Sequence, residues 1–201
     1  MLRHDVGSVD SAAVDKVVDD TARWSSSLAN ALASFTNGQV YRDTVSGALL
    51  FGPQPEIAPL AFTYAVFAAG EGPTLRLFEA KRNVAVHQPY RKILLYANGV
   101  RSRAIQLFGI PSAQNAATGL IDDWLFQPLQ LESAQQGWRF TYRPLCDEFM
   151  IGSMFVSSTE NSGLFCCDDL YVECSKDGGL VHYETLDDAV EAALRRDRNA
   201  A

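Results

Sequence analysis

Apolar residues near the N-terminus recur at the three- and four-residue steps of an amphipathic helix. They are Val14, Val17, Val18, Trp24, Leu28, Leu32 and Phe35. Ser8, Asp10 or Ser11 can serve as the N-cap, and Asn37-Gly38 is a typical stop signal. The pattern therefore predicts one helix between about residues 8 and 35.

The next segment has the patterning of a β-hairpin, with strands expected at 39–42 and 48–51. After several prolines, the apolar spacing of Leu60, Tyr64 and Phe67 predicts a helix over about residues 59–69. A further helix is expected over residues 74–83.

Pro89 and Asn98-Gly99 bracket another predicted helix, because proline suits an early helical position and Asn-Gly suits the helix end.

Beyond residue 100 the apolar pattern changes to that of β-strands. Strands are expected within 104–110, 138–142, 149–151, 164–167, 169–174 and 180–183. The chain closes with a predicted helix from Thr185 to about Arg196, whose stripe of Leu186, Ala189, Val190 and Ala193 should be buried. The order of elements predicts an α+β fold, with a mainly antiparallel or mixed β-sheet packed against N-terminal helices and one C-terminal helix.

A chain of 201 residues is within the range that one hydrophobic core can organise, so one domain over residues 1–201 is expected. No apolar run is long enough to cross a bilayer, and the first residues lack the apolar core of a secretory signal. We therefore expect a cytoplasmic protein without membrane association. The four cysteines lack zinc-site spacing and are expected to be reduced and mostly buried, so neither a metal nor a cofactor is expected.

The net charge of −7 is concentrated in the second half of the chain. Residues 1–100 carry nine acidic and nine basic side chains, whereas residues 147–191 carry eleven acids and one base, Lys176. Such a field repels phosphate backbones and attracts basic proteins or cations. Direct binding of nucleic acid is therefore not expected.

The candidate binding residues are an acidic docking patch and one aromatic anchor: Asp147, Glu148, Glu160, Asp168, Asp169, Glu173 and Trp124. Trp124 lies in an apolar cluster flanked by acids, a composition typical of interface hot spots. The alternative interpretation is a solvated acidic surface and a buried tryptophan. A metal site at Asp168 and Asp169 is disfavoured, because neighbouring strand residues point to opposite faces.

Two further interpretations concern single residues. Cys166 or Cys167 with His182 could supply a thiol nucleophile and its base, which would make the chain a small thiol hydrolase. Asn161 is interpreted as a tight-turn residue in preference to a binding residue. Gly152 is expected where two backbones approach closely.

Three segments in this order resemble the Smi1/Knr4 (SUKH) superfamily. They are the Pro89 to Gly99 helix, the stretch Leu107-Phe108-Gly109, and Ile151-Gly152 followed by Ser158-Thr159-Glu160-Asn161. The resemblance covers about residues 74–196, so residues 1–53 would be an N-terminal elaboration of one helix and a hairpin.

The resemblance implies binding, not catalysis. Bacterial members resemble immunity proteins that neutralise toxins, often nucleases or deaminases, and fungal relatives resemble signalling scaffolds. The acidic second half suits the first role, because nucleases need basic clefts. We therefore expect an immunity protein with a basic protein toxin as its partner, with a regulatory or scaffold protein as the alternative.

Overall fold

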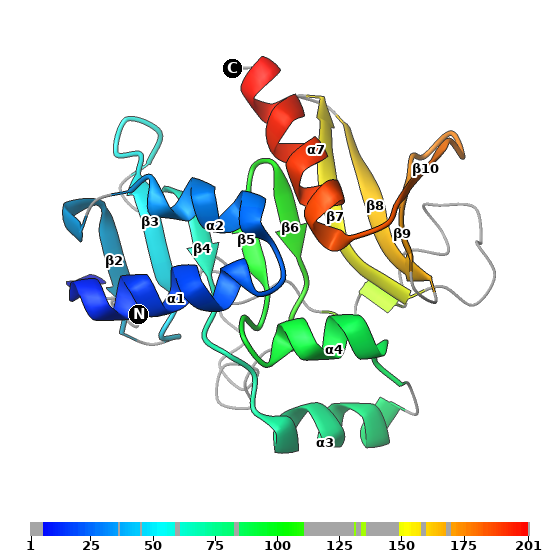
Figure 1. The fold of residues 1–201 in the computed structure, drawn as a ribbon, viewed down its shortest axis with the longest axis horizontal. Helices are drawn as coiled ribbons and strands as arrows, with labels where there is room; N and C mark the ends of the chain where they lie inside the picture. The colour runs from blue at the N-terminus through cyan, green and yellow to red at the C-terminus, as the bar shows by residue number, and fades with distance from the viewer. Residues whose placement is uncertain are drawn as a thin grey trace.

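The computed structural model shows a long antiparallel sheet with helices packed along it (Figure 1). The residues it describes are 6–35, 37–44, 46–58, 61–82, 85–110, 131, 134–135, 149–157, 160–167 and 170–200. In this part of the chain, no helix combines the length and the apolar character that a membrane crossing requires.

The described residues form a sheet of ten strands, each hydrogen-bonded to the next strand along the chain in antiparallel pairing. The strands are β1 (Val6–Ser8), β2 (Val40–Asp43), β3 (Leu49–Pro53), β4 (Phe62–Val66), β5 (Val100–Ser102), β6 (Ile105–Leu107), β7 (Phe149–Ser157), β8 (Glu160–Cys167), β9 (Leu170–Cys174) and β10 (Leu180–Tyr183). The predicted α+β class and the antiparallel pairing are confirmed.

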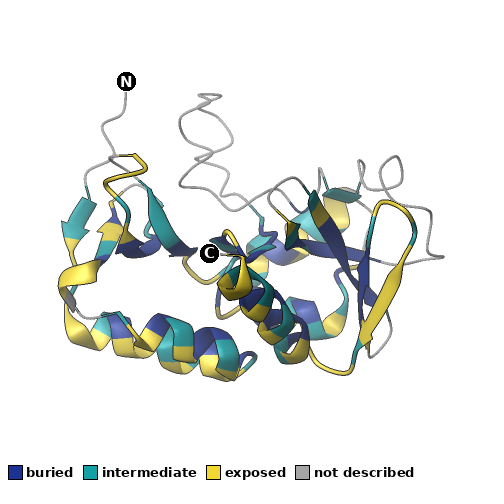
Figure 2. Cartoon of the chain, turned by 90° about the horizontal axis from the view of Figure 1, so that it is seen from above, coloured by how far each residue is buried: buried dark blue, intermediate teal, exposed yellow. Residues whose placement is uncertain are grey.

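The described helices are α1 (Ser11–Ala22), α2 (Ser26–Ala33), α3 (Gly72–Arg82), α4 (Gln88–Leu94) and α7 (Leu186–Asn199), and a short 3-10 turn covers Asn37–Gln39. Of these helices, α1, α2 and α7 lie on one side of the strands when the molecule is seen from above (Figure 2), and α3 and α4 lie beyond one end of the strands (Figure 1). The C-terminal helix α7 packs on α2 and on β7. Among the described residues, the larger of two core clusters runs from Val14 in α1 to Leu194 in α7, so the first and last helices share one apolar interior.

The single helix expected over residues 8–35 is in fact two helices. Helix α1 ends at the C-cap Arg23, and Ser25 begins α2 as its N-cap, accepting a hydrogen bond from the amide of Leu28 at 3.1 Å. The apolar spacing continues across the break, so hydrophobic periodicity alone could not locate it. The short polar cap residue was the available signal.

The helix expected over residues 59–69 is wrong, because residues 62–66 form β4. This strand is held between β3 and β5, which satisfy its backbone groups on both sides. Tyr64 and Val66, spaced by two, are both buried. The apolar residues in this segment therefore fit a buried strand, which short runs do not distinguish from a helix by periodicity.

The hairpin of β2 and β3 is confirmed, and so are the helices near residues 74–83 and 89–97. The latter, α4, ends earlier than expected, at Leu94. Asn98 is therefore not a cap of this helix. Its side-chain amide instead donates to the carbonyl of Ile110 at 2.7 Å and accepts from the Ile110 amide at 2.8 Å, and Gly99 follows with a positive φ of 102°.

In the second half, the strands expected near 104–110, 149–151, 164–167, 169–174 and 180–183 are confirmed. The strand expected over 138–142 lies outside the described residues. Asn161 is not a turn residue, because it lies within β8 opposite Phe155 of β7. The close approach at Gly152 is confirmed: a Cβ atom there would collide with the backbone carbonyl of Gln106.

The C-terminal helix begins where the sequence predicts. Thr185 and Asp188 form a capping box in which each side chain bonds the other residue's backbone amide. The stripe of Leu186, Ala189, Val190 and Ala193 is buried, with at most 3% of each residue exposed. This helix is therefore an integral part of the core.

Candidate protein-binding surface

Glu173 does not belong to an exposed docking patch, because its residue is only 4% exposed. Arg196 of α7 donates to both carboxylate oxygens, from Nη1 to Oε1 at 2.7 Å and from Nη2 to Oε2 at 2.8 Å. The hydroxyls of Ser162 and Tyr183 add hydrogen bonds of 2.6 Å and 2.7 Å. The prediction of Glu173 as a partner-binding residue is corrected: the side chain joins β8, β9, β10 and α7 inside the molecule.

The ionisation of this cluster follows from its contacts. Burial raises the pKa of the Glu173 carboxyl, but the hydrogen bonds from Arg196, Ser162 and Tyr183 outweigh that effect and leave the pKa below its usual value. Burial, together with the hydrogen bond to Glu173, raises the pKa of Tyr183. The carboxylate is therefore held ionised between neutral hydroxyls and one guanidinium.

Five of the predicted binding residues lie outside the described residues: Trp124, Asp147, Glu148, Asp168 and Asp169. Their part in an interface stays a prediction. Glu160 is described, at the start of β8 and partly exposed.

Glu160 lines a polar hollow of about 900 Å³, which lies at one end of strands β6, β7 and β8. Asn161, Ser153 and Lys176 line it as well. Arg103 contributes a guanidinium, which is paired with Asp197 of α7 and lies 5.6 Å from the ring centre of Phe155. Acidic and basic groups are therefore mixed in this hollow.

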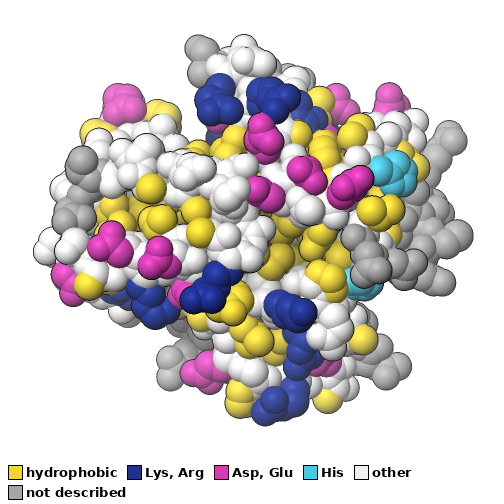
Figure 3. Space-filling model, in the orientation of Figure 1, with side chains coloured by type: hydrophobic (Ala, Val, Ile, Leu, Met, Phe, Trp, Pro, Cys, Tyr) yellow, Lys and Arg dark blue, Asp and Glu magenta, His cyan; other side chains and the backbone are white. Residues whose placement is uncertain are grey.

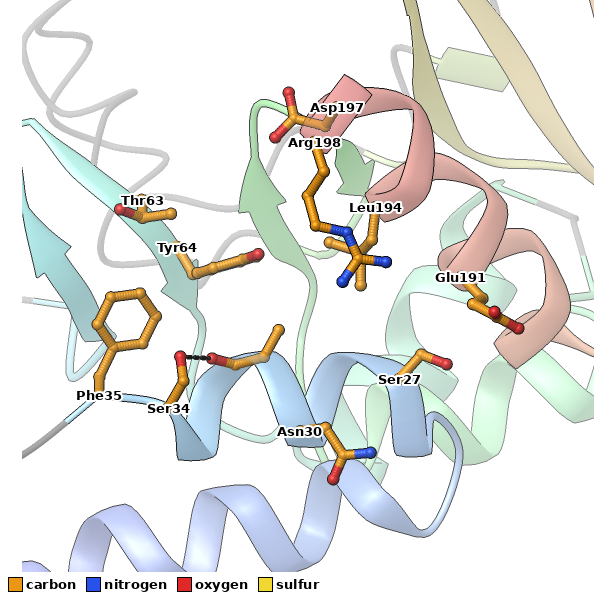
Figure 4. Close-up of a pocket in the computed structure, with 11 residues that line it drawn as sticks. Ser27, Asn30, Ser34, Phe35, Thr63, Tyr64, Glu191, Leu194, Asp197 and Arg198 are labelled. Atoms are coloured by element: carbon orange, nitrogen blue, oxygen red, sulfur yellow. Dashed lines mark hydrogen bonds between the residues drawn. The ribbon is translucent and has the colours of Figure 1, made fainter. Parts of the chain in front are cut away.

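A second hollow, a groove of about 520 Å³, separates α2 and β4 from α7 (Figure 4). Ser27, Asn30 and Ser34 of α2 form one wall, since they lie about one helical turn apart. Tyr64 of β4 forms part of the floor. Figure 4 shows the guanidinium of Arg198 extending from α7 toward α2.

The groove is electrostatically uneven. Glu191, Asp197 and Arg198 all line it from α7. Burial, and then the charge of Asp197, raise the pKa of the Tyr64 hydroxyl, which stays a neutral donor. The groove therefore offers hydroxyl, amide and carboxylate groups to a protein side chain, with one guanidinium among them.

One acidic residue of α7 holds the N-terminal helices in place. Asp187 accepts hydrogen bonds from the Ser25 hydroxyl at 2.7 Å, the Ser26 hydroxyl at 2.6 Å and the Ser27 amide at 3.0 Å. Burial opposes ionisation, but these bonds keep the pKa of Asp187 below its usual value. This contact between residues about 160 positions apart was not predicted, because the sequence shows only an acid in the first turn of a helix.

Among the described residues of the acidic segment 147–191, the exposed acids are Asp177, Glu184, Asp188 and Glu191. Asp188 closes the capping box, and Glu191 pairs with Arg195 at 2.6 Å. Figure 3 shows acidic side chains gathered over the first part of α7, basic ones over its C-terminal end, and further basic ones over α3 and α4 on the same face. The exposed acids of the segment 147–191 that the structure describes therefore extend from the turn before β10 onto the first half of α7.

The cysteines do not lie as the hydrolase interpretation requires. Cys166 is 1% exposed, and its Sγ lies 3.2 Å from Nδ1 of His87, the residue before α4. His182 is on β10, separated from Cys166 by strand β9. The sequence interpretation missed His87, because only the tertiary structure brings together residues 79 positions apart.

Among the residues that the structure describes, there is no group of three or more His, Cys, Asp or Glu side chains that could hold a metal ion. Comparison with protein-family models, with curated proteins and with solved structures found no match for this chain.

Proposed function

We propose that this chain is an immunity protein, which binds a basic bacterial toxin domain and neutralises it without catalysis. The observation that carries the proposal is the position of the exposed acids. Asp177, Glu184, Asp188 and Glu191 follow one another from the β9–β10 turn to the middle of α7. Between residues 147 and 191 the sequence has eleven acidic residues and one basic residue, Lys176.

Nuclease and deaminase toxins act on nucleic acids or nucleobases, and a nuclease must hold phosphate in a basic cleft. An acidic protein surface competes with phosphate for such a cleft and accelerates association by electrostatic steering. The groove beside α7 adds hydroxyl and amide groups that can orient a partner side chain. Inhibition then needs occupation of the cleft and no chemical step.

A regulatory or scaffold protein of the Smi1/Knr4 type would use the same surface, so the surface alone does not separate the two functions. An inhibition assay separates the two functions. An immunity protein abolishes the activity of its partner in a stoichiometric complex, whereas a scaffold leaves that activity intact. A thiol hydrolase is less favoured, because Cys166 and Cys167 are both on β8 and strand β9 separates them from His182 on β10. Cys166 is buried, Cys167 is partly exposed, and neither lines the two hollows described above.

The test begins with capture of the partner from the native cell on the tagged chain and its identification by mass spectrometry. The purified partner is then assayed for nuclease or deaminase activity while the chain is titrated in. We expect a basic partner whose activity falls to background at one equivalent. A partner of acidic character, or one that keeps full activity in the saturated complex, would contradict the proposal.

A further inference from the structure

Strand β10 is the last strand of the sheet (Figure 1). It carries exposed apolar side chains. Among the described strands it pairs with β9 alone. Leu180 is 44% exposed and Val181 is 50% exposed, and Leu170 at the start of β9 is 43% exposed. An open strand edge with apolar side chains is a surface on which a further strand can add.

The hydrogen bonds of the β9–β10 hairpin fix which backbone groups face outward. The amide of Ser175 donates to the carbonyl of Gly179 at 2.9 Å, and the register continues without a bulge along β10. Because bonded and non-bonded pairs alternate in an antiparallel ladder, Val181 directs its N–H and C=O toward β9. Leu180 and His182 direct theirs away from the sheet.

Two acids lie at the ends of this edge. Asp177 precedes β10 and Glu184 follows it, and both are exposed. The Ser175 hydroxyl and the Gly179 amide bond the carboxylate of Asp177 and lower its pKa, so it stays ionised. Lys176, the base of the same turn, lines the polar hollow with Glu160. The flanking charge therefore favours a basic strand.

A second copy of this chain suits the edge less well. An isologous pair that joins the outward groups of Leu180 to those of His182 in the other copy would be antiparallel. That register places Glu184 of each copy beside the turn containing Asp177 and Gly178 of the other. The like charges at both ends would oppose the pairing.

We propose that β10 docks an extended segment of a basic protein partner, which adds to the sheet as a further strand. The backbone of the segment bonds the outward N–H and C=O groups of Leu180 and His182. Leu180 and Val181 point to opposite faces of the sheet, so the apolar side chains of the segment cover Leu180 on one face. Its basic side chains lie near Asp177 and Glu184. The inference rests on the proposed function only for the identity of this partner as a toxin.

The test uses the full chain and a fluorescein-labelled short peptide of alternating lysine and valine, with fluorescence anisotropy as the readout. We expect His182→Pro, which removes an outward N–H, to weaken binding by about tenfold, the effect of one or two lost backbone hydrogen bonds. His182→Ala is the matched control, because it removes the same side chain and keeps the N–H. It should bind like the wild type.

A peptide with N-methyl groups on every backbone amide tests the same contact without changing the protein, because it blocks both edges of the added strand. This measurement remains valid if His182→Pro does not fold. The methylated peptide should bind at least tenfold more weakly than the unmodified peptide. Amide chemical-shift changes on peptide binding should centre on β10. A peptide of alternating glutamate and valine should bind more weakly than the lysine peptide.

The proposal that β10 docks a strand would be wrong if the methylated and unmodified peptides bound with equal affinity. It would also be wrong if the amide chemical-shift changes lay far from β10. A concentration-dependent dimer in sedimentation that His182→Pro abolishes would assign the edge to a second copy instead. If a folded His182→Pro chain binds the toxin with the affinity of the wild type and neutralises it, the docking site at β10 is wrong and the proposed function stands. If the peptide binds at β10 but the captured partner is not inhibited, the proposed function is wrong and β10 remains the docking site.

Discussion

Arg196 on the last helix and Glu173 on strand β9 form a two-pronged ion pair, with Nη1–Oε1 and Nη2–Oε2 distances of 2.7 Å and 2.8 Å. The carboxylate is nearly inaccessible, whereas the arginine keeps 31% of its side-chain surface. The pair therefore joins α7 to the sheet at a point where removal of either partner leaves a poorly solvated charge.

Glu173→Ala should lower the free energy of unfolding by about 3 kcal/mol, because Arg196 and two hydroxyls lose a buried acceptor. Urea unfolding followed by circular dichroism measures the loss. Glu184→Ala, at an exposed acid outside the pair, is the control and should change stability by less than about 0.5 kcal/mol. Similar losses for the two variants would show that the pair contributes no more than surface charge.

The same carboxylate predicts an acid-sensitive fold. The folded pKa of Glu173 is below its ordinary value of 4.5, so its stabilisation is present above that value and is lost as pH falls through the lower folded pKa. The melting temperature of the wild type should therefore fall steeply below about pH 4.5. Glu173→Gln, which cannot titrate, should show a shallower decline. Parallel acid profiles would contradict this assignment.

The contacts of Asp187 predict how the N-terminal helices are attached. Asp187→Asn should lower the free energy of unfolding by about 1–3 kcal/mol, since charge-assisted bonds from Ser25, Ser26 and Ser27 are weakened. Glu191→Gln, one turn further along α7, is the matched control. Hydrogen exchange should rise in α2 before it rises in β8. Uniform acceleration over both elements would mean that Asp187 supports the whole fold equally.

The buried stripe of α7 gives a packing prediction. Leu186 is 3% exposed, so Leu186→Ala should cost about 2–5 kcal/mol, the range for deleting a buried leucine side chain. Leu95→Ala removes a leucine that is 44% exposed and should cost much less. Thermal unfolding of both variants measures the difference. Equal melting temperatures would place α7 outside the cooperative core.

The acidic surface predicts a kinetic effect on binding. The double change Glu184→Gln and Asp177→Asn should slow association with the basic partner several-fold at low salt, with a smaller change in the dissociation rate. The difference from the wild type should shrink as salt screens the charges. Surface plasmon resonance at two salt concentrations tests it. If the association rate equalled that of the wild type in both buffers, Asp177 and Glu184 would contribute to solubility and not to partner binding.

The sequence by itself determined the elements whose signals are local. Thr185 with Asp188 defines the start of α7, Pro89 defines the start of α4, and the Gly178-Gly179 turn separates β9 from β10. Each depends on capping or turn chemistry within a few residues, so it can be predicted from the sequence alone. The α+β class, with a mainly antiparallel or mixed sheet, followed from the order of these elements, and the structure supplied the antiparallel pairing.

Only the tertiary structure decided which polar residues are accessible. Glu173 and Glu184 are both acids near the C-terminus, yet one is enclosed by Arg196 and the other faces solvent. The approach of His87 to Cys166 and of Asp187 to Ser25 likewise depends on how helices pack on the sheet. Residues 62–66 became a strand because β3 and β5 bond both edges of β4. Such long-range pairing leaves no periodic pattern in the sequence. It determines which side chains are buried, and therefore which charged groups are exposed on the surface.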